Sequence, residues 1–117
     1  MQYEDIQQGD VVVRYREHGK EIIVPKSAKR LVPTDRGHIL ALGEATNHMH
    51  RIAEQWADQV EVWEDTDGTL YIKSLAPNVP ITHEEHAPTP LIPHRVGKRV
   101  IVQEQSPFDE AARNVVD

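Results

Sequence analysis

Hydrophobic residues in this chain come in short runs separated by glycine and proline, a pattern typical of short strands. The most regular runs are residues 60–63 and 69–72, which alternate between apolar and polar positions. The turn between them ends in Asp67-Gly68, and Asp-Gly between two alternating runs is a strong hairpin signal. We therefore predict an antiparallel hairpin over residues 60–72.

Other runs rich in β-branched residues predict further strands. We expect residues 11–15 and 21–24 to form one hairpin and residues 30–32 and 38–42 to form a second. Two more strands are expected at 79–83 and 99–103. The three prolines between these strands favour an edge or a loop, because proline cannot donate to a strand ladder.

Two segments have apolar residues at helical spacing. In residues 51–60 no clear N-cap is present, so a loop with a single turn is the alternative. In residues 107–116, Ser106 can cap the helix and Pro107 suits its first position. The apolar residues of this second segment form one stripe, which we expect to dock on the sheet or across a homodimer: Phe108, Ala111, Ala112, Val115 and Val116.

These patterns predict a mainly β fold, a small barrel or sandwich with a short C-terminal helix, in one domain of 117 residues. The longest apolar run has four residues, 39–42, which excludes a membrane-spanning helix and argues against a signal peptide. The chain has no cysteine, and a cytoplasmic location is the expectation. Its net charge of −6 argues against nucleic acid as a partner.

Histidine is unusually frequent and clustered. Of seven histidines, four fall in two short segments, His48 with His50 and His83 with His86. Residues two apart on a strand share a face, so His48 and His50 can present two imidazoles to one metal ion. His83 and His86 can both join them only if the backbone turns there. Imidazole-rich sites favour zinc, and Ni, Fe, Mn and Cu are the alternatives.

Three carboxylates lie close to these histidines in the sequence. Glu44 has the same strand parity as His48 and His50, and we consider it a candidate general base or, alternatively, a surface residue. Glu84 is the second candidate base for metal-bound water, and it or Glu85 could instead orient an imidazole. A catalytic metal, a purely structural metal and a metal-free binding module with a histidine-lined polar groove all remain open. The sequence does not define a small-molecule substrate.

The histidine segments resemble an uncharacterised family of small bacterial and phage proteins, over most of the chain. The shared elements are Gly43-Glu44-x-Thr46-x-His48-x-His50 and His83-Glu84-Glu85-His86-Ala87-Pro88. The His-x-His element also resembles the first metal-binding motif of cupins, with Glu54 near the position of the motif's glutamate. That resemblance implies a cupin-like β-barrel and a later histidine ligand, His83 or His86. The glycine pattern of the second cupin motif is absent from the sequence.

Overall fold

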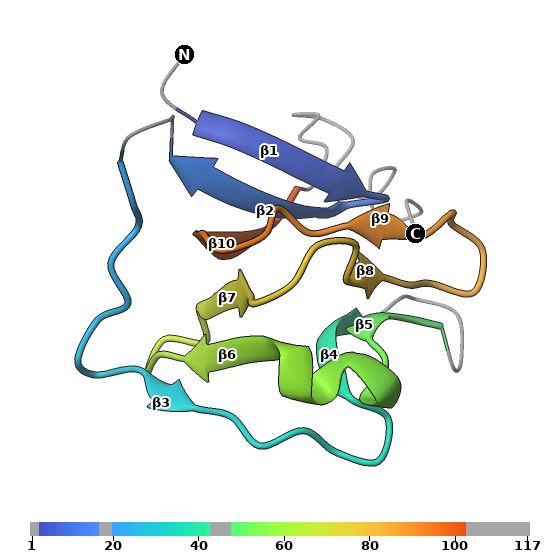
Figure 1. Cartoon of the computed structure of the whole chain (residues 1–117), viewed down its shortest axis with the longest axis horizontal. Helices are drawn as coiled ribbons and strands as arrows, with labels where there is room; N and C mark the ends of the chain where they lie inside the picture. The colour runs from blue at the N-terminus through green and yellow to red at the C-terminus, as the bar shows by residue number, and fades with distance from the viewer. Residues whose placement is uncertain (1–2, 17–19, 43–47, 103–117) are drawn as a thin grey trace, which may run out of the picture.

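The computed structural model describes residues 3–16, 20–42 and 48–102. Strands dominate these ranges, and the only helix within them is the short 3-10 helix η1 (Glu54–Gln59). Figure 1 shows this arrangement. The prediction of a mainly β fold is therefore confirmed. The predicted C-terminal helix over residues 107–116 lies outside the described residues.

A six-stranded antiparallel sheet forms the larger layer of the described residues. Its strand order is β1 (Tyr3–Gln8), β2 (Val11–Arg16), β10 (Val96–Ile101), β7 (Leu70–Ser74), β6 (Val60–Glu64) and β3 (Lys29–Arg30). The pairing of β6 with β7 confirms the predicted hairpin over residues 60–72. No closed barrel is found among the described strands.

Two small sheets cover one face of the large sheet. One pairs β4 (His38–Leu42) with β5 (Met49–Ile52), and the other pairs β8 (Pro80–Ile81) with β9 (Thr89–Pro90). Their apolar side chains join those of the large sheet in one buried cluster, which includes Val13, Tyr15, Leu40, Ile52, Val62, Ile72 and Ile81. Burial of this cluster is the main stabilising contribution to the fold, since apolar area removed from water contributes about 25 cal/mol per Å².

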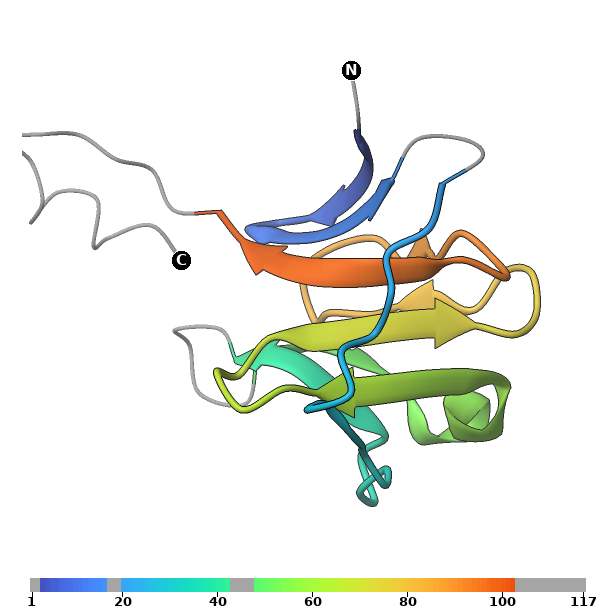
Figure 2. The same cartoon turned by 90° about the vertical axis from the view of Figure 1, so that its left-hand side faces the viewer.

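The predicted first hairpin is wrong. Strand β2 pairs with β1, which was not predicted, and residues 21–24 form no strand. Most side chains of β1 are exposed, so its sequence lacks the strong hydrophobic alternation of a half-buried strand. In Figure 2, residues 20–28 cross in front of the large sheet on the way from β2 to β3.

The predicted second hairpin is also wrong. Strand β3 pairs with β6, and β4 pairs with β5. Residues 33–37 do make a tight turn, with an isolated bridge between Thr34 and Gly37, but no strand pair extends from it.

In the segment 51–60, for which a helix was predicted, β5 continues to Ile52 and only residues 54–59 are helical. The structure thus lies between the predicted helix and the alternative of a loop with one turn, because η1 is a 3-10 helix of six residues. Within the described ranges, no helix has the length and apolar character needed to cross a membrane.

Tyr15 links the large sheet to the segment that follows β9. Its ring is fully buried, and its hydroxyl oxygen accepts a hydrogen bond from the backbone N–H of Ile92 at 3.2 Å. Burial raises the pKa of Tyr15 to about 12. Replacing Tyr15 by phenylalanine should lower the free energy of unfolding by about 1 kcal/mol, because the N–H loses its partner. Urea denaturation tests this, with the exposed Tyr3→Phe as a control that should change little.

Candidate functional site

Strand pairing brings the two histidine segments together. An isolated antiparallel bridge joins Arg51 in β5 to Thr82 just after β8, with N–H···O bonds of 3.0 and 2.8 Å in the two directions. In an antiparallel pair, the residue before one partner lies opposite the residue after the other. His50 therefore lies opposite His83. The backbone bends over residues 84–86, which turns His86 back toward the same place.

The side chains of His48, His50, His83 and His86 form what we call the histidine cluster. The His83 ring lies 5.6 Å from His48, 4.3 Å from His50 and 4.7 Å from His86, between ring centroids. The centroids of His50 and His86 are 5.8 Å apart. His50 is 3% exposed, whereas His86 lies at the surface. The sequence spacing thus identified four side chains that do lie together.

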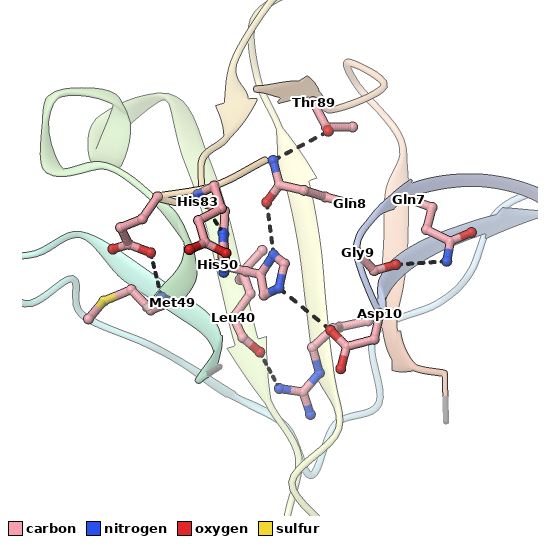
Figure 3. A network of polar contacts seen from close by, with 12 residues as sticks. Gln7, Gln8, Gly9, Asp10, Leu40, Met49, His50, His83 and Thr89 are labelled. Carbon is pink, nitrogen blue, oxygen red and sulfur yellow. Dashed lines mark hydrogen bonds and ion pairs between the residues drawn. The ribbon is translucent and has the colours of Figure 1, made fainter. Parts of the chain in front are cut away.

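Gln8, at the end of β1, fixes the tautomer of His50. Its side-chain Nε2 donates to the carbonyl oxygens of Ile81 and Ala87 at 2.8 and 2.9 Å, so its Oε1 must be the acceptor facing His50. The distance from His50 Nδ1 to Gln8 Oε1 is 2.9 Å, and Nδ1 must therefore carry the proton. In the neutral ring, the lone pair then lies on Nε2. Figure 3 shows this buried connection.

The turn between β1 and β2 forms one wall of the cluster. Gly9 has a φ of +60°, and a Cβ atom at this position would lie 2.9 Å from His86 Nε2 and 3.2 Å from His50 Cε1. Glycine is therefore needed both for the backbone conformation and for the close approach of the two rings. Next to it, Asp10 Oδ1 lies 3.6 Å from His50 Nε2 (Figure 3).

The two glutamates of the bend are used in different ways. Glu84 Oε1 accepts the backbone N–H of Met49 at 2.8 Å, and this hydrogen bond, with one from its own N–H, lowers the pKa of Glu84. The Glu85 backbone N–H donates to His83 Nδ1 at 3.0 Å, and Glu85 Oε2 lies 3.9 Å from His48 Nε2. The other candidate base, Glu44, lies outside the described residues.

In the described part of the chain, no three histidine, aspartate or glutamate side chains are arranged to hold a metal ion. The rings of the cluster pack against one another, and His83 Nδ1 accepts a hydrogen bond, which in the neutral ring puts its proton on Nε2. Metal binding would thus require rotation of His83. The cluster has the side chains that such a site needs, gathered in one place, with His50 already oriented.

Two of the remaining histidines lie away from the cluster contacts. His38 is buried in β4, and desolvation, followed by the charge of Arg30, lowers its pKa. His94 is exposed with a φ of +67°.

Three residues of the site were not predicted from the sequence: Gln8, Gly9 and Asp10. The Gly9-Asp10 pair does signal a turn, but only the pairing of β1 with β2 and the contact of β1 with β9 reveal that this turn faces the histidines.

A family model described as a domain of unknown function, DUF8820, covers residues 7–95. This range includes the β1–β2 turn and all four residues of the histidine cluster. No curated protein and no solved structure matches the chain.

Proposed function

Since the chain belongs to the DUF8820 family, a domain family of unknown function, we propose from its own residues that it binds one divalent transition metal ion at the histidine cluster. Zinc is the first choice, because imidazole nitrogen and carboxylate oxygen both suit it. Ni, Fe, Mn and Cu are the alternatives.

The observation that carries this proposal is the hydrogen bond between Gln8 and His50. Histidines that ligate metals almost always donate their other N–H to a carbonyl or carboxylate, which fixes the tautomer and aims the ligating nitrogen. The Gln8 amide is itself held by two backbone carbonyls, so it holds the His50 ring in one orientation. A buried imidazole held by a side chain that is itself fixed by two hydrogen bonds is typical of a functional histidine.

Further donors lie around His50. Asp10 Oδ1 is 3.6 Å from its Nε2, and His83 and His86 contact its ring. Ligands of one tetrahedral zinc ion lie about 3.4 Å apart, given Zn–N bonds of about 2.0–2.1 Å. Rotation of the His83 and His86 side chains toward His50 Nε2 and Asp10 is the rearrangement that this proposal requires. His48 is the fifth donor, at the outer side of the cluster.

A structural or binding role for the metal is better supported than catalysis. Glu84, the candidate base, has its carboxylate engaged with the Met49 N–H, which lowers its pKa and makes it a weaker base. The donors come from the β1–β2 turn, β5 and the bend after β8, so a bound ion would join three separate segments. Metal binding free energy then contributes directly to folding.

A metal-free binding module is the second candidate. His48 has a side chain that is 25% exposed and lies beside Glu85, and His86 lies at the surface. These side chains could line a polar groove for a partner. This candidate predicts no effect of metal ions on stability.

Zinc titration of untagged, chelator-treated protein separates the two. We expect one bound zinc per chain by elemental analysis, and stabilisation of about 2.7 kcal/mol when free zinc is 100 times its dissociation constant. His50→Ala and a His83→Ala/His86→Ala variant should each lose the bound zinc. His94→Ala is the matched control, since it removes an exposed imidazole away from the cluster and should bind normally. Absence of stoichiometric metal in folded wild-type protein, with each of the five ions tested, would refute the metal proposal.

A further inference from the structure

A second feature of the molecule lies on the outer face of the six-stranded sheet, at the other end of β1 from the histidine cluster. Here the segment 20–28 crosses the sheet (Figure 2). Side chains of the sheet and of this segment line a hollow of about 420 Å³. Its lining includes Tyr3, Arg14, Arg16, Glu21, Tyr71 and Lys98. The hollow has the volume of a small-ligand site, for which about 300–1,000 Å³ is usual.

Strand register explains why these side chains meet. Lys98 in β10 pairs with Arg14 in β2 on one side and with Tyr71 in β7 on the other. Directly paired residues point to the same face of a sheet, and like charges in such a pair are destabilising. Arg14 also pairs with Asp5 of β1 on its other side, so the register gives Arg14, but not Lys98, a carboxylate directly opposite.

The charge of the hollow is opposite to that of the whole chain. The chain carries a net charge of −6, yet three cations and one carboxylate, that of Glu21, line the hollow. Arg14 is neutralised by a two-point ion pair with Asp5, at 2.9 and 3.0 Å. Among the described residues, no carboxylate lies within salt-bridge distance of Lys98 or Arg16. Arg16 Nε is also buried without a hydrogen-bond partner in that part of the chain.

Aromatic rings accompany these cations. The Tyr3 side chain is 47% exposed, with Arg14 5.4 Å from its ring centroid, and Tyr71 lies next to Lys98 in the register. Cations beside an exposed aromatic ring suit a ligand that combines phosphate with a planar base, because the base can stack while the phosphate meets the positive charge. We propose that this hollow binds a nucleotide unit, with its phosphate on Arg16 and Lys98 and its base on Tyr3. The unit can come from a free nucleotide or from a single-stranded nucleic acid.

Fluorescence anisotropy with a labelled oligothymidylate of eight nucleotides tests this proposal, on the full chain in buffer with a chelator. We expect binding that weakens as salt is raised, because phosphate contacts are screened. Competition by unlabelled thymidine monophosphate would identify free nucleotides as ligands, and its failure would identify the strand. Absence of binding at low salt of both the oligonucleotide and thymidine monophosphate, the latter measured by isothermal titration calorimetry, would overturn the proposal. So would competition by inorganic phosphate as effective as that by the nucleotide, because the aromatic ring would then contribute nothing.

Variants locate the binding to the hollow. Lys98→Glu should weaken binding about tenfold or more, and Tyr3→Ala roughly fivefold or more, the loss expected for one base stacked on an aromatic ring. Both side chains are exposed, so the fold should tolerate these changes, which circular dichroism can check. Lys29→Glu in β3 makes the same change in net charge outside the lining of the hollow. Equal weakening by Lys29→Glu and Lys98→Glu would show that the oligonucleotide responds only to net charge, and would overturn the proposal.

Discussion

Replacing Gly37 by alanine is expected to lower the free energy of unfolding by about 3 kcal/mol or more, through strain and overpacking together. Gly37 has a φ of +85°, a conformation that residues with a side chain rarely adopt. A Cβ atom there would also collide with the carbonyl oxygen of Ile52 and lie 2.7 Å from the carbonyl carbon of Ala53. These are backbone atoms, which cannot rotate away as a side chain can. The contact between the 33–37 turn and the end of β5 must then open.

Gly68→Ala is the matched control for this prediction. Gly68 has nearly the same φ, +87°, but its Cβ position has no atom within 4 Å. Its substitution should lower the free energy of unfolding by about 1–2 kcal/mol, from backbone strain alone. Urea denaturation of both variants gives the difference directly. Equal losses for the two variants would mean that the turn moves away from β5 without cost.

The second large effect is expected at Gln8. Its side chain is 3% exposed and bonds to His50 Nδ1, Ile81 O and Ala87 O. Replacing it by leucine, of similar size, should cost about 2–4 kcal/mol, because a buried imidazole N–H and two carbonyls lose their partner together. The midpoint of thermal or urea unfolding measures this loss.

Gln7→Leu provides the control one residue away. Gln7 is exposed, and its amide donates only to the carbonyl of Gly9 among the described residues. Its substitution should change stability by about 0.5 kcal/mol or less. A loss at Gln8 as small as that at Gln7 would show that water replaces the buried amide, and the orientation of His50 would then not depend on Gln8.

Local signals predicted the elements of this fold better than their pairing. The Asp67-Gly68 turn and the alternation around it are local, and the β6–β7 hairpin is confirmed. The pairing of β2 with β1 and β10, and of β3 with β6, depends instead on which apolar faces meet in the core. Turn signals at 18–20 and 33–37 suggested hairpins that do not form. Turn chemistry favours a reversal of the chain, but it does not specify the partner of the strand that follows.

For the candidate site too, local spacing was informative and contacts between distant segments were not predicted. The spacing of His48 and His50, and of His83 and His86, indicated that these side chains act as a group, and the structure does bring them together. The contribution of Gln8 and Asp10 could not be predicted, since they come from the end of β1 and the turn after it, about 40 residues before His48 and His50 in the sequence. Nothing in a glutamine or an aspartate beside glycine indicates a contact with an imidazole.

The side chain of Gln8 also has a consequence for the order of folding. It bridges residues 8, 50 and 81–87, so its hydrogen bonds close loops of about 40 to 80 residues. Contacts of such long sequence separation form late, because the entropy of loop closure is lost before the contacts compensate for it. The environment of His50 should therefore become native only in the last kinetic step, after the β6–β7 hairpin. A resolved NMR signal of the His50 ring would then report the completion of folding.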